Sequence, residues 1–207
     1  FEFPFPCEIH PNGFYLGDNP DLEKYRAGKD VFKVLVIGGE PEPIRISESY
    51  LNDIHEYFDL IISHDSRHAS YRNCSIHTFT VWMVDSPPTS KNFSVSHIYS
   101  IGGGARNLSG YLLRDQVFDN IERFNIEKNW YCSNRIDPSL RRNLPTLIDD
   151  KRDCLFTSMF NIAIENTIEK DYFSEKLQDC FQTYTVPIYY GCSNPNEHGI
   201  SEDGIIR

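Results

Sequence analysis

The sequence has no excess of basic residues and no closely spaced cysteine pair. Its 20 lysines and arginines are outnumbered by 30 aspartates and glutamates, giving a net charge of −10. Such a charge repels polyanions, and the basic residues are scattered, so nucleic acid is not expected as a partner. The six cysteines include no CxxC pair, which argues against a zinc ribbon or a thioredoxin-like motif. Several cysteines lie within apolar runs, where a buried thiol is the commoner state.

Other familiar signals are missing as well. No run of about 18 apolar residues and no signal peptide occurs, so no transmembrane segment is expected. The G-x-S-x-G, H-E-x-x-H and P-loop motifs are absent, which leaves histidine-based hydrolytic chemistry without support. His64 and His68 could meet at i, i+4, but no third ligand is obvious, so a loop with a helix cap is favoured over a metal site. The ends "FEFPFPCEIH" and "EDGIIR" read as domain interior, and we expect a trimmed or incomplete chain.

The pattern of apolar residues predicts an α/β protein. Short runs rich in β-branched and aromatic residues are typical of strands covered on both faces, as in parallel sheets. These runs are 31–39, 58–64, 78–83, 93–100, 159–166 and 185–191. Amphipathic helical patterns lie between them at 47–58, 109–124 and 174–184. The alternation predicts a mostly parallel sheet.

Helix signals and one linker complete the predicted organisation. Ser109 and Ser174 are suitable N-caps for the second and third helices. The third helix places Leu177, Cys180, Phe181 and Tyr184 on one apolar face. The segment "DSPPTSKNF" (85–93) is the best boundary, dividing a short first domain (1–88) from a second domain (89–207). Two such Rossmann-like halves would leave a cleft, and ligands of open α/β sheets bind at strand carboxyl ends.

The stretch "IENTIEKDYFSEKLQDCF" (164–181) is the first candidate site. Glu165 and Asn166 follow a predicted strand, and a helix opens at Ser174 with Glu175 and Lys176 in its first turn. A helix N-terminus attracts anions, and a lysine there is unfavourable for the helix itself, so an anionic partner is indicated. The alternative is an ordinary solvated helix start, which the pattern alone slightly favours.

Two further residues are candidates, each with a simpler alternative. Glu40 follows the strand and glycine pair of "VIGGEPEP" and could act as a general base, or be a polar turn residue before Pro41. Arg114 lies one turn into the helix after "IGGGARNLSG" and could bind phosphate bidentately, or be a surface arginine. The glycines form no G-x-G-x-x-G fingerprint.

The segment "FNIAIENTIEKDYFSEKLQDCFQTYTVPIYYG" (160–191) closely resembles the signature of glycosyltransferase family 10, the α-1,3/4-fucosyltransferases. That signature reads F-x-L-A-F-E-N-(S/T), then D/G-Y-(V/F)-T-E-K, then (V/I)-P-(I/V)-x-x-G. Ser174 stands where the family usually has Thr. Weaker similarity includes "SGYLLRDQVFDNI" (109–121), "GGEPEP" (38–43) and "FDLIISHD" (58–65).

The resemblance implies a fold, a reaction and roles for individual residues. The fold would be GT-B, with two Rossmann-like domains facing across a cleft, the first on the acceptor side and the second binding the nucleotide sugar. The reaction would be inverting transfer of L-fucose from GDP-fucose to a glycan acceptor. Asn166, Tyr172, Glu175 and Lys176 match donor-binding positions. Lys176 and Arg114 would contact the diphosphate, Glu175 the ribose hydroxyls, and Glu40 would be the general base.

Elementary chemistry is consistent with these roles. A departing nucleoside diphosphate needs charge neutralisation more than a proton, and arginine and lysine supply it without a metal. The absence of a D-x-D pair likewise leads us to expect no divalent metal and no other cofactor. Two alternatives stay open: a transferase using another nucleotide sugar, and a catalytically silent sugar-nucleotide or glycan-binding module. A cytoplasmic location is expected for a bacterial or viral protein, and is favoured, whereas a eukaryotic fragment would belong to the Golgi lumen.

Overall fold

The computed structural model describes residues 7–11, 31–37, 48–77, 83–84, 86–100, 108–147 and 152–207. The chain divides into two compact units. Unit 1 comprises residues 1–79 and 170–172, and unit 2 comprises residues 80–169 and 173–207. Each unit contains one four-stranded sheet, and every strand pair among the described residues is parallel. The predicted parallel α/β class is therefore confirmed.

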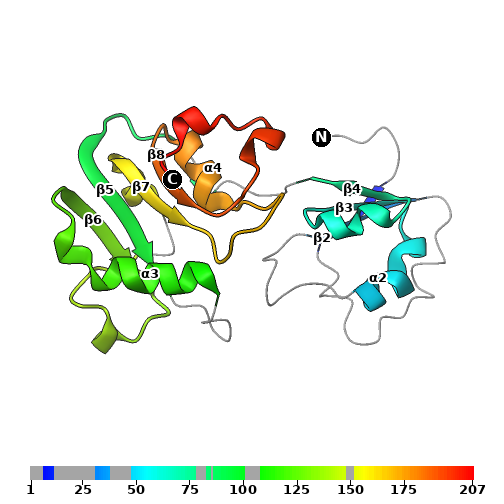
Figure 1. The fold of residues 1–207 in the computed structure, drawn as a ribbon, viewed down its shortest axis with the longest axis horizontal. Helices are drawn as coiled ribbons and strands as arrows, with labels where there is room; N and C mark the ends of the chain where they lie inside the picture. The colour runs from blue at the N-terminus through cyan, green and yellow to red at the C-terminus, as the bar shows by residue number, and fades with distance from the viewer. Residues whose placement is uncertain are drawn as a thin grey trace. The chain divides into compact units, whose positions relative to one another are not determined.

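Unit 1 is a small α/β unit with the strand order β1-β2-β3-β4 (Figure 1). Its elements are β1 (Cys7–Pro11), β2 (Phe32–Ile37), α2 (Glu48–Ile54), η2 (His55–Tyr57), β3 (Leu60–Ser63), η3 (Ser66–Ser70) and β4 (Cys74–Ile76). Its core is formed by apolar side chains of the two central strands, of α2 and of the residue after η2, which are Leu35, Ile37, Leu51, Ile54, Phe58 and Ile61. The predicted helix 47–58 thus forms as α2 followed by a 3-10 turn.

Unit 2 contains the longer elements and the strand order β6-β5-β7-β8. In chain order these elements are β5 (Asn92–Tyr99), α3 (Ser109–Asp119), η4 (Ile121–Arg123), β6 (Glu127–Cys132), η5 (Pro138–Leu140), η7 (Asp153–Thr157), β7 (Ser158–Ile164), α4 (Glu175–Gln182), β8 (Val186–Tyr190), η8 (Pro195–His198) and η9 (Glu202–Gly204). The central strands β5 and β7 lie between the two edge strands. Their carboxyl ends therefore meet at one edge of the sheet.

The two long helices of unit 2 pack on opposite faces of its sheet. Successive strand residues point to opposite faces. Ala163 packs with Leu177 and Cys180 of α4, whereas its neighbours Ile162 and Ile164 pack in the cluster that includes Leu113 and Val117 of α3. The sheet of unit 2 is thus a layer between α3 and α4, as the near-continuous apolar strands predicted.

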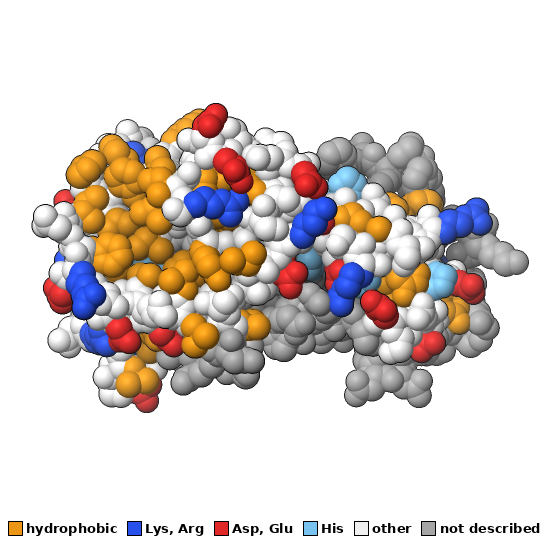
Figure 2. Space-filling view, in the orientation of Figure 1, with side chains coloured by type: hydrophobic (Ala, Val, Ile, Leu, Met, Phe, Trp, Pro, Cys, Tyr) orange, Lys and Arg blue, Asp and Glu red, His pale blue; other side chains and the backbone are white. Residues whose placement is uncertain are grey.

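The face of the sheet that α3 covers is only partly enclosed. Figure 2 shows hydrophobic side chains gathered over the strands of unit 2 on the face in view. Phe93 of β5 is 68% exposed and makes an edge-to-face contact with Phe160 of β7, with 5.8 Å between ring centroids. This part of the apolar surface is therefore in contact with solvent.

Most predicted elements of the described residues form, with local differences. Strands β1, β4 and β6 were not predicted, and the predicted strand 78–83 lies mostly outside the described residues. Ser109 is the first residue of α3 and not its N-cap, because the extended residue is Leu108. Phe181 and Tyr184 were predicted on the buried helix face but are 36% and 80% exposed. The helix ends at Gln182, so Tyr184 lies beyond it with a positive φ of 55°.

Thiols and histidines behave largely as the sequence predicts. Cys74, Cys132, Cys154, Cys180 and Cys192 are thiols and not disulfides. Asp65 caps η3 by accepting a hydrogen bond from the Arg67 backbone N–H, which confirms the predicted loop with a helix cap. The buried His68 places Nδ1 2.9 Å from Ser63 Oγ. The helices that the structure describes include none long and apolar enough to cross a membrane.

Candidate donor site

The candidate site lies at the carboxyl end of β7, where both long helices of unit 2 begin. Glu165 and Asn166 follow directly after the last strand residue, Ile164. The backbone N–H of Gly110, in the first turn of α3, donates to Asn166 O at 2.9 Å. The Glu165 carboxylate accepts from the backbone N–H of Ser174, the N-cap of α4, at 2.8 Å. Two helix N-termini and one strand end are therefore joined by hydrogen bonds, as expected for a ligand site of an open parallel sheet.

Arg114 is buried and fixed by β7. Its side chain is only 3% exposed, so the surface alternative considered from the sequence is wrong. One Nη donates to Asn166 Oδ1 at 2.7 Å and to the carbonyl of Ile164, and the guanidinium lies 4.8 Å from the Tyr111 ring centroid. A terminal guanidinium NH2 group carries two hydrogens, which explains how one nitrogen holds two acceptors. The helix pattern predicted the position of Arg114 but not its burial.

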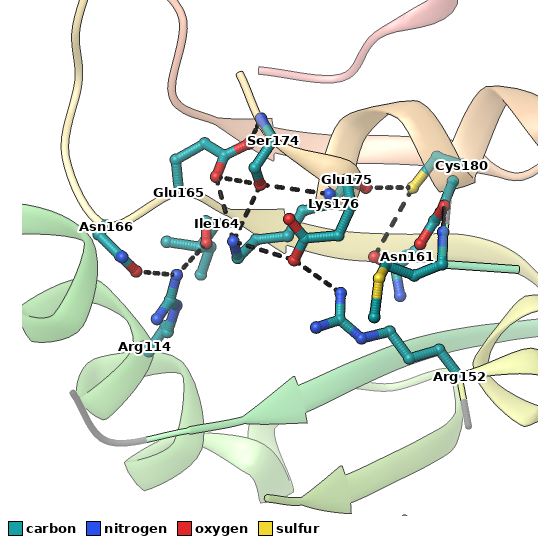
Figure 3. A network of polar contacts seen from close by, with 12 residues as sticks. Arg114, Arg152, Asn161, Ile164, Glu165, Asn166, Ser174, Glu175, Lys176 and Cys180 are labelled. Carbon is teal, nitrogen blue, oxygen red and sulfur yellow. Dashed lines mark hydrogen bonds and ion pairs between the residues drawn. The ribbon is translucent and has the colours of Figure 1, made fainter. Parts of the chain in front are cut away.

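Lys176 contacts three oxygen-bearing side chains (Figure 3). Its Nζ lies 3.3 Å from Glu165 Oε2, 2.9 Å from Ser174 Oγ and 3.4 Å from Glu175 Oε1. Burial acts to lower the pKa of Lys176, but the carboxylates of Glu165 and Glu175 outweigh it and raise this pKa above its usual value. The unfavourable first-turn lysine thus has intramolecular carboxylate partners, which the sequence argument for an anionic ligand did not foresee.

Glu175 links Lys176 to a second arginine. Arg152 Nη1 donates to Glu175 Oε1 at 2.7 Å. Burial acts to raise the Glu175 pKa, but Lys176 and Arg152 together lower it to about 2. Glu175 is therefore a carboxylate at neutral pH and can accept hydrogen bonds. The network combines three cations with the two carboxylates of Glu165 and Glu175, so its net charge is +1 when all five are ionised.

Sequence reasoning underestimated Glu165 and Arg152. Glu165 was placed at the strand end but given no role, although it is 0% exposed and accepts hydrogen bonds from two residues. Glu165 directly follows the near-continuous apolar strand β7. That position was the feature of the sequence from which its burial could have been predicted. Arg152 stands alone before a 3-10 turn, 23 positions from Glu175, and no local pattern links the two.

Of the two remaining predicted site residues, one belongs to unit 1 and one lies outside the described residues. Tyr172 belongs to unit 1, where its ring centroid lies 5.1 Å from that of His64. Glu40 lies outside the described residues. The structure therefore brings four of the predicted site residues together within unit 2. These residues are Arg114, Asn166, Glu175 and Lys176. Among the described residues, no group of three or more His, Cys, Asp or Glu side chains is arranged to hold a metal ion.

Asp179 of α4 is a buried acid near the network. It is 0% exposed, its Oδ1 accepts the backbone N–H of Met83 at 2.9 Å, and its Oδ2 has no hydrogen-bond partner among the described residues. Desolvation raises the Asp179 pKa to about 6, although the Met83 N–H and Arg152 act to lower it. The pKa of Asp179 is higher in the folded protein than in the unfolded chain, so binding of a proton to Asp179 stabilises the fold. This stabilisation is fully present below about pH 4 and is lost as the pH rises through about 6.

Asp179→Asn is expected to stabilise the protein at pH 8 by about 1–3 kcal/mol, because no buried charge remains there. The amide oxygen of the asparagine can still accept the hydrogen bond from the Met83 backbone N–H. Urea unfolding at pH 8 and pH 4 measures the effect, which should be much smaller at pH 4, where Asp179 is already protonated. Asp203→Asn, at an exposed aspartate of η9, is the control. An equal effect of Asp179→Asn at both pH values would contradict the argument.

Comparison with known proteins places this geometry in a class. The fold is a parallel α/β protein with a cation-rich site at strand ends, a class to which nucleotide-binding proteins belong. Residues 116–204 match the model described as glycosyltransferase family 10 (fucosyltransferase) C-term. The resemblance found in the 160–191 motif is thereby confirmed for this C-terminal part of the chain. Arg114 lies just before the matched segment and Glu40 far before it.

Three solved structures align with this chain at low sequence identity. An α1,3-fucosyltransferase is 12% identical with a TM-score of 0.47, and the alignment covers 91% of this chain and 70% of that one. Structures titled α1,3-fucosyltransferase with GDP and with GDP-fucose are each 14% identical with a TM-score of 0.48. They cover 93% and 92% of this chain, respectively, and 70% of the matched chain in each case. No curated protein matches the chain.

Proposed function

We propose that this chain transfers L-fucose from GDP-fucose to a glycan hydroxyl with inversion at the anomeric carbon. The observation that carries the proposal is the convergence of Arg114, Lys176 and Arg152 at the end of β7 and the first turn of α4. Excess positive charge at helix N-termini favours an anionic ligand. A nucleoside diphosphate fits this charge, and the family match supports fucose as the transferred sugar.

The reaction assigns a separate task to each group. The acceptor hydroxyl oxygen attacks the anomeric carbon while the bond from that carbon to the diphosphate oxygen breaks. The Glu40 carboxylate takes the hydroxyl proton, and GDP leaves as an anion. Arg114 and Lys176 stabilise the charge that develops on the diphosphate, so the proposal requires no divalent metal. The ionised Glu175 accepts hydrogen bonds from the ribose hydroxyls.

The remaining parts of the proposal concern the whole protein. Residues 1–88 form the acceptor-side domain and residues 89–207 the donor domain of a GT-B enzyme, with the reaction taking place between them. Asn166 and Tyr172 complete the donor site. The same network would also suit another nucleotide sugar, because it addresses diphosphate and ribose rather than the sugar. Donor binding without transfer would instead favour a binding module.

Lys176→Ala is expected to weaken GDP-fucose binding at least 10-fold, because one charge-assisted contact to the diphosphate is lost. Calorimetry with GDP-fucose, GDP-mannose and UDP-sugars measures donor affinity and identifies the sugar nucleotide. Glu40→Gln should leave this affinity almost unchanged but abolish transfer. Lys128→Ala, at an exposed lysine of β6, is the matched control. Full transfer by both Lys176→Ala and Glu40→Gln would exclude the proposed function.

A further inference from the structure

Glu165 is an acid with no exposure to solvent. Its Oε1 accepts the Ser174 backbone N–H at 2.8 Å, and its Oε2 accepts the Ser174 hydroxyl at 2.7 Å. The same Oε2 lies 3.3 Å from Lys176 Nζ. Burying a carboxylate without such partners costs several kcal/mol or more. One side chain therefore holds both the N-cap of α4 and the lysine in its first turn.

The surrounding backbone leaves Glu165 little freedom to move. Its N–H donates to Tyr190 O at 2.7 Å, which fixes the backbone against the edge strand β8. A Cβ on Gly191 would lie 2.4 Å from Glu165 Cγ, and one on Gly110 would lie 1.8 Å from Glu165 O. Both values are below any normal carbon contact. Two glycines thus provide the space in which the carboxylate sits, one beside its side chain and one beside its backbone.

We infer that Glu165 is a positioning residue: its carboxylate holds the Lys176 ammonium and the first turn of α4 where the nucleoside diphosphate binds. This inference rests on the proposed function. A lysine has a flexible four-carbon stem and about 2 kcal/mol of rotamer entropy. An ammonium already held between Glu165 and Ser174 loses less of this entropy when a phosphate arrives, which is the advantage of preorganisation.

Glu165 and Glu175 differ in what they do for Lys176. The side chain of Glu175 is 20% exposed and also binds Arg152, whereas that of Glu165 is fully buried and is directed at Ser174 and Lys176. Both carboxylates oppose the effect of burial, which would otherwise lower the pKa of Lys176. Removing the Glu165 charge leaves this desolvation in place and keeps only Glu175 as counter-charge. The Lys176 pKa should then fall, because Arg114 and Arg152 also act to lower it.

Glu165→Gln tests the inference because the amide keeps the shape and removes the charge. GDP affinity should fall by up to about 30-fold at pH 7, because a Lys176 side chain that is no longer held loses its rotamer freedom when GDP binds. It should fall further as the pH rises from 7 to 9, because Lys176 loses its proton. The ratio of variant to wild-type Kd is taken at each pH, which cancels the titration of the nucleotide. A constant ratio near 1 across this range would overturn the inference.

Two further proteins separate the possible failures. Glu165→Asp keeps the charge on a shorter stem, so GDP should bind more weakly than to the wild type but with a pH-independent Kd ratio. If the Gln variant does not fold, the Asp variant decides, and unchanged GDP affinity in a folded Asp variant overturns the inference. Wild-type protein that binds neither GDP nor GDP-fucose would overturn the proposed function itself. Binding that is lost in Lys176→Ala but unaffected in Glu165→Gln would overturn only the positioning role.

Discussion

Replacing Gly110 with alanine is expected to destabilise unit 2 by about 3 kcal/mol or more, the upper range for overpacking of a rigid site. A Cβ at this position would lie 1.8 Å from Glu165 O and 2.7 Å from both Asn166 C and Asn166 O. All three atoms belong to the backbone, so no side-chain rotation can relieve the overlap. The hydrogen bond from Gly110 N–H to Asn166 O would also be lost as the helix moves away.

The sign of this effect distinguishes close packing from helix propensity. Alanine is favoured over glycine within helices by up to about 1 kcal/mol, so propensity alone predicts stabilisation. Urea unfolding followed by circular dichroism measures the difference. Gly204→Ala is the control, because its Cβ would meet only Phe181 Cε1 at 3.9 Å, and an effect within about 0.5 kcal/mol is expected. A stable Gly110→Ala protein would mean that α3 does not approach β7 as closely as described.

The sequence was most informative where apolar residues run continuously. Strands β2, β3, β5, β7 and β8 follow such runs and were predicted to within two residues of their observed ends. Strand β6 was missed because Glu127 and Lys128 begin it and only Trp130 and Cys132 are buried. Its apolar signal is too short to separate from a loop. The pairing with β5, and not its own composition, makes this segment a strand.

Helix ends were predicted less well than helix positions. Ser174 is a true N-cap because it is extended and its hydroxyl accepts the Lys176 backbone N–H. Ser109 has the same chemistry, but the residue before it takes the extended conformation. The close contact of Gly110 with Asn166 sets where α3 begins. Such a tertiary constraint leaves no trace in the local sequence.

The site was predicted in part, for reasons that differ between residues. Asn166, Glu175 and Lys176 lie in one continuous motif, so strand and helix patterns place them together. Arg114 joins the site because α3 packs against β7, a contact that no local pattern predicts. Arg152 was not identified, because the partners of a long-range ion pair are not separated by any characteristic number of residues in the sequence. The role of Glu40 as general base stays a prediction, as do the donor-binding roles of all these residues.

Replacing Arg114 with methionine is expected to have the second of the two largest effects. The Ile164 carbonyl and Asn166 Oδ1 would lose a charged donor in a site where Arg114 is 3% exposed. Each buried acceptor left without a partner costs about 1–3 kcal/mol, so a loss of about 2–6 kcal/mol is expected in total. Methionine fills most of the aliphatic volume and separates this polar effect from simple loss of packing.

Arg114→Lys separates charge from geometry, because lysine keeps the charge but lacks the planar guanidinium that lies over the Tyr111 ring. If Arg114 binds the diphosphate as proposed, donor affinity should fall about 100-fold in Arg114→Met and by an intermediate factor in Arg114→Lys. Urea unfolding and calorimetry with GDP are measured on the same samples, with the exposed Arg123→Met of η4 as control. Loss of stability with unchanged GDP affinity would make Arg114 a structural clamp of β7 and remove it from the donor site.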